Sequence, residues 1–330
     1  MFADAKWVWM DGQFVPWRDA TLHVSSHALH YGTGVFEGIR CYETADGPAL
    51  FRADAHFERF FASAAVYGLR IPCSAVELME ATCELVQRNG FGACYVRPIC
   101  YYGSATLGLI PDRCPVHVSI LAWPWKNLHT GNPVRSGVSV GISRWQKFSS
   151  KMMPATAKAC GQYVNSVLAV REAIAAGFDD AILLDAAGNV CEGSGENVFV
   201  IKDNVIYTND QRHSILMGIT RDSVITVARD AGFRVETRAL QFSDLIEADE
   251  AFLTGTAIEV VHLRSLDGKP IAQGKKGRVT ALLQREYFDV VYGRNERYRR
   301  WLIRVNDNRS RRIGARKGSK VQPPGQRNTG

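Results

Sequence analysis

Apolar and polar residues alternate with the period of a β-strand in several parts of the first 125 residues. The dipeptide Asp11-Gly12 interrupts one such run, and Asp-Gly is typical of a two-residue hairpin turn. A similar polar interruption at Ala45-Asp46-Gly47 predicts a second turn. The pattern therefore predicts hairpins over residues 7–17 and 34–52, and longer strands over residues 94–102 and 116–123.

Two stretches between these strands place apolar residues three or four positions apart, as on one face of a helix. The first covers residues 54–67, where Asp54 is placed to cap the N-terminus. The second covers residues 74–87, with Ser74 as the N-cap and Gly90 just past the end. Strands and helices together predict a compact α+β unit over residues 1–125.

A polar stretch over residues 126–136 is predicted to link this unit to a larger domain over residues 137–305. Strands in that domain are predicted at residues 137–145, 180–185, 190–201, 233–237, 251–254 and 258–266, and helices at 162–175, 221–231 and 279–291. Strands outnumber helices and do not alternate strictly with them, which argues against a doubly wound parallel sheet.

The formal net charge of +7 is concentrated at one end of the chain. Residues 306–330 hold seven Arg or Lys and one Asp, which is a net of +6. Because this tail is polar and rich in Gly, Pro, Ser and Asn, we expect it to be disordered. The eight cysteines include no CxxC pair, and no apolar run is long enough to span a membrane, so we expect a cytoplasmic protein with reduced thiols.

Lys158 is the first candidate for chemistry, because Ala157 and Ala159 flank it within a run of small residues. Small neighbours let a flat ring approach the amine, and confinement favours the neutral form of a lysine. A neutral amine can attack a carbonyl and form a Schiff base. Tyr163 lies five residues later and could place a phenol beside the same ring. The alternative is a surface lysine at the start of an Ala-rich helix.

Glu192 begins the run EGSGENVFV, which superficially suggests a nucleotide-binding glycine loop. The third glycine is missing and the run continues into a strand, so the dinucleotide interpretation is rejected. What remains is a carboxylate beside glycines that allow a flat group to approach. Such a carboxylate could keep a ring nitrogen protonated, although a solvent-facing acidic turn is the simpler alternative.

Two small-residue turns could together bind a phosphate. Thr220 is predicted to cap the helix over residues 221–231, whose first-turn amides would form an anion site with the Ile219 segment. Thr256 lies in a second turn, and Arg59 on the first-domain helix could bind phosphate through two nitrogens. A Schiff-base lysine, a phenol, a ring-facing carboxylate and a phosphate cup describe pyridoxal 5′-phosphate.

Seven motifs extend this pattern over about residues 5–305. They are SHALHYG from Ser26, VFEGIR from Val35, YVRP from Tyr95, the Lys158–Tyr163 run, EG through EN from Glu192, GIT from Gly218 and GTA from Gly255. With them the chain resembles the branched-chain amino-acid aminotransferases of the fold-type IV pyridoxal-phosphate class. The resemblance implies a small α+β N-terminal domain and a larger β-rich, pseudo-barrel C-terminal domain.

The resemblance also implies a role for each matching residue. Lys158 would be the catalytic residue and hold the cofactor as an aldimine. The residues that would bind the cofactor are Arg59, Lys158, Tyr163, Glu192, Ile219, Thr220 and Thr256. Those that would bind the substrate are Tyr31, Phe36, Arg40, Tyr95, Arg97 and Ala257. The expected reaction moves the amino group of Leu, Ile or Val to 2-oxoglutarate, in a homodimer whose partner subunit helps to close the site.

Other functions stay open at this point. A D-amino-acid aminotransferase and an aminodeoxychorismate lyase share the fold, and the basic tail suggests weak binding of nucleic acid or an acidic partner. Residues 124–129 lack a tyrosine that some relatives carry, which leaves the substrate range in question. His23, His27 and His30 are irregularly spaced without a nearby acid or cysteine cluster, so no metal site is expected.

Overall fold

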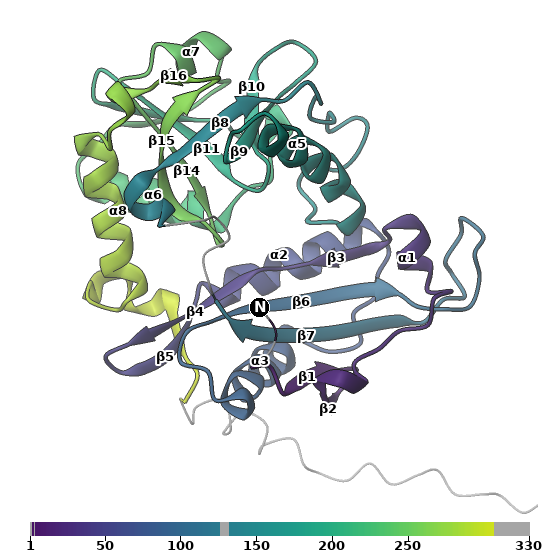
Figure 1. The fold of residues 1–330 in the computed structure, drawn as a ribbon. Helices are drawn as coiled ribbons and strands as arrows, with labels where there is room; N and C mark the ends of the chain where they lie inside the picture. Colours follow the sequence, from purple (N-terminus) through teal and green to yellow (C-terminus); the bar gives the residue numbers. More distant parts are fainter. Residues whose placement is uncertain (1, 3, 126–131, 307–330) are drawn as a thin grey trace, which may run out of the picture.

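The computed structural model describes residues 2, 4–125 and 132–306. Within them the chain forms two sheets stacked one above the other, each with its own helices (Figure 1). The predicted tail lies almost wholly outside the described residues, as does most of the predicted linker. None of the described helices is long and apolar enough to cross a membrane.

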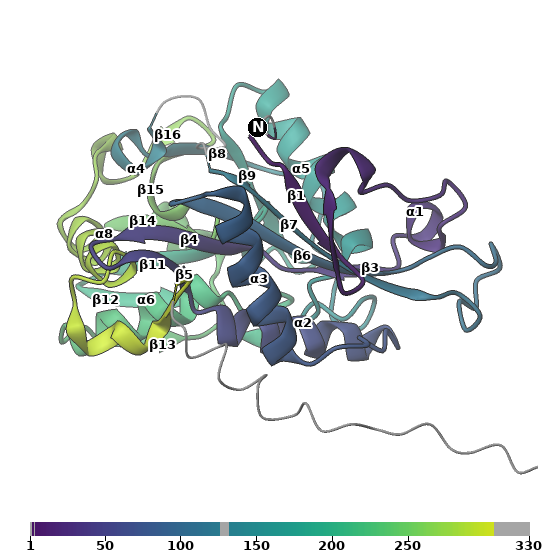
Figure 2. The same cartoon turned by 90° about the horizontal axis from the view of Figure 1, so that it is seen from below.

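Eight strands form the first sheet, in the order β17-β5-β4-β6-β7-β1-β2 with β3 on β6. Their bounds are β1 Trp7–Met10, β2 Gln13–Pro16, β3 Gly34–Phe36, β4 Ile39–Thr44, β5 Gly47–Phe51, β6 Cys94–Tyr102, β7 Val116–Pro124 and β17 Leu302–Arg304. The helices that accompany this sheet are α1 His27–Tyr31, α2 Ala53–Val66 and α3 Ala75–Asn89. Seen from below, α2 and α3 lie against the sheet (Figure 2). Their apolar residues, including Phe57, Phe60 and Leu85, form one buried core with the strands.

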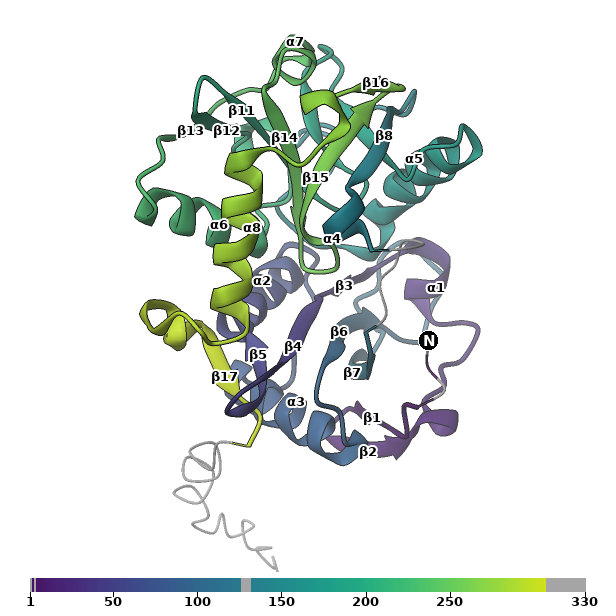
Figure 3. The same ribbon diagram turned by 60° about the vertical axis from the view of Figure 1, so that its left-hand side comes forward.

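The second sheet closes on itself as a barrel. Each of the strands β10, β9, β8, β15, β14 and β11 pairs with the next, and β11 pairs again with β10. Their bounds are β8 Val138–Ile142, β9 Asp180–Leu184, β10 Val190–Gly193, β11 Asn197–Lys202, β14 Glu250–Gly255 and β15 Glu259–Leu266. The strands β12 Val205–Thr208, β13 Val235–Thr237 and β16 Lys269–Pro270 extend it, and its helices are α4 Pro133–Ser136, α5 Tyr163–Ala175, α6 Ile219–Asp230, α7 Phe242–Ile246 and α8 Arg278–Val291. The predicted α+β, two-domain architecture with a pseudo-barrel is confirmed (Figure 3).

Several predicted element boundaries are wrong in instructive ways. Residues 34–52 are not one hairpin, because β3 pairs with β6 and only β4 and β5 form the hairpin. Residues 190–201 are not one strand, because the chain reverses after Gly193 and β10 pairs with β11. Both errors arise from treating an apolar run as continuous where a polar turn interrupts it.

Helix caps were predicted with mixed success. Ser74 caps α3 through a reciprocal bond with Glu77, and Gly90 ends it in the left-handed conformation, as predicted. Asp54 is not the cap of α2, because Arg52 takes that position with φ of 50° and Asp54 falls in the first turn. Thr220 is likewise not the cap of α6. Gly218 is, and Thr220 lies inside the first turn.

An apolar contact joins the two domains. Tyr42 and Phe51, from β4 and β5, belong to the same buried cluster as Tyr287 of α8 and Trp301. The ring of Phe51 lies 5.8 Å from that of Tyr287 and 6.0 Å from that of Trp301, both edge-on. Such edge-to-face pairs add about 0.5–1.5 kcal/mol each beyond their buried area. The contact holds α2 against one end of the barrel.

His262 on β15 is a buried imidazole close to the start of the barrel domain. A Cβ built on Gly137 would lie 2.4 Å from its Nε2, and among the described residues its Nδ1 has no hydrogen-bond partner. Burial, helped by Lys276 and Arg264, lowers the pKa of His262 to about 4. An unfolded histidine titrates near 6.5, so between about pH 6.5 and 4 the unfolded state binds more protons than the folded state.

We therefore expect the free energy of unfolding to fall as the pH drops from about 6.5 to 4, by at most about 1.4 kcal/mol per pH unit from this one group. His262→Leu should remove that part of the slope, measured by urea unfolding at several pH values. The exposed His23→Asn variant is the control. An unchanged slope in His262→Leu would show that His262 does not titrate differently on folding.

Candidate active site

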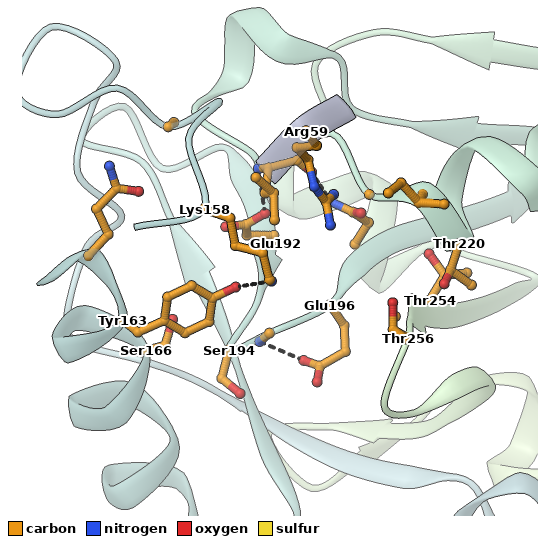
Figure 4. A pocket seen from close by; sticks show the side chains of 18 of the residues that line it. Arg59, Lys158, Tyr163, Ser166, Glu192, Ser194, Glu196, Thr220, Thr254 and Thr256 are labelled. Carbon is orange, nitrogen blue, oxygen red and sulfur yellow. Dashed lines mark hydrogen bonds between the residues drawn. The ribbon is translucent and has the colours of Figure 1, made fainter. Parts of the chain in front are cut away.

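A cavity of about 620 Å³, part of it open to solvent, lies between α2 and the barrel. Figure 4 shows side chains from both domains pointing into it, with Arg59 entering from α2 and the others from the barrel side. The barrel side supplies the loop before α5, the strand β10, the start of α6 and the turn after β14. All seven predicted cofactor-binding residues, Arg59, Lys158, Tyr163, Glu192, Ile219, Thr220 and Thr256, line this one cavity.

Lys158 is held from both sides along its backbone. Its N–H donates to Ser63 Oγ of α2 at 3.0 Å, and its carbonyl accepts from the N–H of Phe36 at 3.0 Å. Its Nζ lies 2.6 Å from the hydroxyl of Tyr163. Burial and then the charge of Arg59 lower the pKa of Lys158 to about 8. The lowered pKa increases the fraction of neutral amine near neutral pH, and the neutral amine is the form that acts as a nucleophile.

Tyr163 opens α5 and stays uncharged. Burial, followed by the charge of Glu192, raises the pKa of Tyr163 well above its usual value. Its ring meets that of Phe36 edge-on, with the centroids 4.8 Å apart. The phenol is thus a fixed, neutral hydrogen-bonding group next to the lysine amine.

Glu192 is almost fully buried, and its carboxylate accepts one hydrogen bond from a charged side chain and one from a backbone N–H. Its Oε1 accepts from Lys147 Nζ at 2.5 Å, and its Oε2 accepts from the N–H of Leu216 at 3.0 Å. Asn197 accompanies it from β11 and donates to the carbonyl of the same Leu216 at 2.9 Å. The N–H and the carbonyl of Leu216 are therefore bonded to side chains from two strands, β10 and β11, and these bonds fix the loop that leads into α6.

The start of α6 provides the expected anion site. Gly218 caps the helix without a side-chain bond, so the first-turn N–H groups are free to meet a ligand. Thr254, buried at the end of β14, has a hydroxyl without a partner among the described residues and lines the same cavity. Arg59 reaches across from α2 and donates to the carbonyl of Met217 at 2.9 Å. These groups converge on one end of the cavity (Figure 4).

None of the six predicted substrate residues is among the residues that line this cavity, and they fall into three groups. Phe36 and Tyr95 lie with Arg97, whose guanidinium stacks 4.6 Å from the ring of Phe36 and 5.5 Å from that of Tyr95. Among the described residues the Nε of Arg97 has no hydrogen-bond partner. A Cβ on Gly38 would lie 1.9 Å from the hydroxyl of Tyr95, so glycine is needed there for Tyr95 to stay in place.

Arg40 forms the second group with Ala257. Its guanidinium lies 3.5 Å from Glu259 Oε1 and 3.5 Å from the carbonyl of Ala257. Tyr42 also donates to Glu259 Oε1, at 3.0 Å. Because Glu259 balances its charge, Arg40 is better placed to fix the turn at Ala257 than to meet a second anion.

Tyr31 forms the third group and lies at the surface of the first domain. Its ring is 43% exposed, and its hydroxyl donates to the carbonyl of Leu107 at 2.6 Å. The neighbouring histidines also face separate partners: His23 bonds Ser25, His27 bonds Thr33 and His30 bonds the carbonyl of Val24.

Residue-by-residue reasoning missed Lys147, Asn197, Glu37 and His56, all of which hold site residues in place. Glu37 was visible as an acid between apolar neighbours in the VFEGIR motif, a pattern that indicates a buried, paired carboxylate. The partner of Lys147 is 45 positions away, and no local pattern indicates it.

Comparisons with known proteins agree with this geometry. The sequence model of the family described as Amino-transferase class IV matches residues 34–266. A branched-chain-amino-acid aminotransferase of Pseudomonas aeruginosa is 44% identical over 294 residues, which cover 89% of this chain and 95% of that protein. The structure of the T.th. branched-chain amino acid aminotransferase, complexed with N-(5′-phosphopyridoxyl)-L-glutamate, aligns with a TM-score of 0.88 at 47% identity over 92% of this chain and 99% of that one. The Escherichia coli branched-chain amino acid aminotransferase aligns with a TM-score of 0.90 at 39% identity over 92% of this chain and 100% of that one.

Proposed function

Because the chain belongs to the class IV aminotransferase family, we propose that it transfers the amino group of L-leucine, L-isoleucine or L-valine to 2-oxoglutarate, with pyridoxal 5′-phosphate as its cofactor. The products are branched 2-oxo acids and L-glutamate. The names of the relatives and the phosphopyridoxyl compound in one solved relative support this reaction. In this chain, the main observation that supports the reaction is a buried lysine with a lowered pKa. It lies in one cavity with a phenol, a carboxylate and an anion site.

The side chains and backbone groups around the cavity fit pyridoxal phosphate in their chemistry. The free amides at the start of α6, the Thr254 hydroxyl and Arg59 suit a phosphate. Glu192 suits a protonated ring nitrogen, and Tyr163 suits the ring hydroxyl. When bound, the cofactor supplies an electron sink for the bond that breaks at the substrate α-carbon.

Lys158 has two tasks in the proposed reaction. Its amine would hold the cofactor between turnovers. Once an amino acid has taken its place, the free Nζ would take the proton from the substrate α-carbon. Burial and the nearby Arg59 favour the neutral amine that this proton transfer needs. The contacts of its backbone with Ser63 and Phe36 keep the lysine in place while its side chain is released.

The substrate pocket must accept an apolar side chain and, in the other half of the reaction, a second carboxylate. Phe36 and Tyr95 provide the apolar wall, and Arg97 provides a cation beside it. A carboxylate in such a pocket without a cation would be a costly unpaired charge. We assign the distal carboxylate of glutamate and 2-oxoglutarate to Arg97, and the α-carboxylate to the turn at Thr256 and Ala257 that Arg40 supports.

We also propose that the enzyme works as a homodimer in which an apolar loop of one copy closes the site of the other. Leu107, Leu109 and Ile110 are 48%, 80% and 71% exposed, and Tyr31 is bonded to this loop. An apolar groove of about 880 Å³, partly open to solvent, runs along the same domain between Leu22 and Leu121. A large exposed apolar surface on one molecule is typical of a subunit contact.

The first test is the absorbance spectrum of the purified protein before and after addition of L-leucine. We expect a visible band that L-leucine bleaches, and neither band nor bleaching in Lys158→Ala, whose turnover should fall at least about 10²–10⁴-fold. The exposed Lys151→Ala variant should behave as wild type. A band that responds to D-leucine and not to L-leucine would replace the proposed substrate class, and no band at all would overturn the cofactor.

A second test separates the two substrate classes. In Arg97→Met we expect kcat/KM for 2-oxoglutarate to fall by roughly 10²–10⁴-fold, because a distal carboxylate would be buried without a partner. The value for L-leucine should change by less than about threefold. Arg88→Met, at a surface ion pair with Glu84, is the control. Equal losses for both substrates would contradict the role given to Arg97.

A third test addresses assembly. Sedimentation velocity should show a dimer for the wild type, and Leu109→Glu should shift it toward the monomer and lower turnover by about tenfold or more, because a buried charge at the contact is costly. Ile246→Glu, which changes an exposed apolar residue on α7 of the other domain, should leave both the dimer and the turnover unchanged. A wild-type monomer with full activity would exclude the shared site.

A further inference from the structure

A buried carboxylate stands behind the arginine that faces the phosphate end of the cavity. Glu37, in the turn between β3 and β4, is 0% exposed. Its Oε1 accepts from Arg59 Nε at 2.6 Å and its Oε2 accepts from Arg59 Nη2 at 3.0 Å, a two-pronged contact. We propose that Glu37, assisted by His56, is a positioning residue that aims Arg59 at the cofactor phosphate and so sets the affinity for phosphorylated cofactor, an inference that rests on the proposed function.

Three of the five N–H donors of Arg59 already have partners in the protein, and these contacts restrict how its side chain can turn. A guanidinium has five N–H groups in a rigid plane. Two go to Glu37 and one, from Nη1, goes to the carbonyl of Met217 at 2.9 Å. Within the described part of the chain, that leaves one N–H on each of Nη1 and Nη2. Because Glu37 and Met217 fix the guanidinium plane at two separate points, the directions of the two remaining N–H groups are fixed as well, and Arg59 lines the cavity.

Both oxygens of Glu37 accept hydrogen bonds. Its Oε2 also accepts from His56 Nδ1 at 2.6 Å and from the N–H of Gly38 at 3.1 Å, which brings the donors around the carboxylate to four. Three of these donors meet Oε2 and one, Arg59 Nε, meets Oε1, so both oxygens are held in place. Glu37 does not line the cavity, and its contacts serve only to hold its neighbours in place.

The charges in this cluster are arranged to keep it stable. Burial would raise the pKa of Glu37, but Arg59 and His56 outweigh it and hold that pKa far below its usual value. Burial lowers the pKa of His56 more than Glu37 raises it, so His56 is a neutral donor. The cluster therefore combines one anion with one cation and adds no net charge to this side of the cavity.

Glu37 has two opposite effects on how tightly Arg59 would bind a phosphate. By partly neutralising Arg59, Glu37 weakens its attraction for a phosphate. By fixing its plane, Glu37 removes the entropy cost of orienting a long side chain when the ligand binds. The proposal is that orientation dominates, which a single variant can decide because the two effects have opposite signs.

The experiment titrates the cofactor-free full-length chain with pyridoxal 5′-phosphate and, separately, with pyridoxal, which lacks the phosphate. In Glu37→Gln we expect the Kd for pyridoxal phosphate to rise by about 10- to 100-fold, as for loss of hydrogen bonds to a charged group. The Kd for pyridoxal should stay within about threefold. His56→Gln, which keeps a donor, should show the same selective effect at about 3- to 10-fold, and exposed Glu58→Gln on the same helix should show none.

Two results would overturn the inference. Tighter binding of pyridoxal phosphate by Glu37→Gln would mean that charge neutralisation dominates. An equal loss for both compounds would mean that Glu37 supports the whole cavity and not the phosphate contact. Either result leaves the proposed function standing as long as the wild type binds pyridoxal phosphate and bleaches with L-leucine, whereas a wild type that binds neither compound would remove the proposed function itself.

Discussion

Packing between the first sheet and the barrel fixes one side of the cavity, because Arg59 reaches it from α2 and its other lining residues belong to the barrel domain. Tyr42 and Phe51 bury their rings among Tyr287 and Trp301, and this places α2 opposite the start of α6. Arg59 can touch Met217 only while that contact holds. Since protein interiors are packed as densely as organic crystals, a small change at the aromatic contact would be transmitted to the cavity and not absorbed.

Within the barrel, one backbone segment connects the two ends of the cavity. Leu216 donates to Glu192 at the end that would face the ring and accepts from Asn197 two residues before the helix cap at Gly218. Lys147 balances the carboxylate from the opposite side. A ligand that pulls on Glu192 would therefore also move the loop that forms the anion site. Glu192 and the loop before α6 are therefore coupled through Leu216, and Lys147 takes part in this coupling through its ion pair with Glu192.

Local chemistry in the sequence predicts features whose cause is local. Ser74 and Gly90 end a helix because of their own side chains, and Lys158 is surrounded by small residues that are its chain neighbours. The resemblance predicts seven residues from separate parts of the chain to bind a cofactor, and all seven line one cavity.

Features that depend on distant partners were beyond such reasoning. Arg52 caps α2 in place of Asp54 because its N–H bonds to the carbonyl of Trp301 while its side chain reaches Asp222, contacts that exist only in the folded chain. The exchange of Thr220 for Gly218 as the cap of α6 follows from Asn197, whose side chain occupies the space a Cβ on Gly218 would need. Tyr31 matches the motif, but its hydroxyl donates to the carbonyl of Leu107, a loop residue 76 positions away.

The strand β17 has a consequence for the order in which the chain can assemble. It comes from residues 302–304, after the whole barrel, yet it pairs with β5 of the first sheet. During synthesis, one edge of β5 therefore has no partner strand until β17 has been made. About 250 further residues must be synthesised before that happens. An unpaired edge is a template for other strands, so a nascent chain of this protein is most exposed to misassociation just before its last strand arrives.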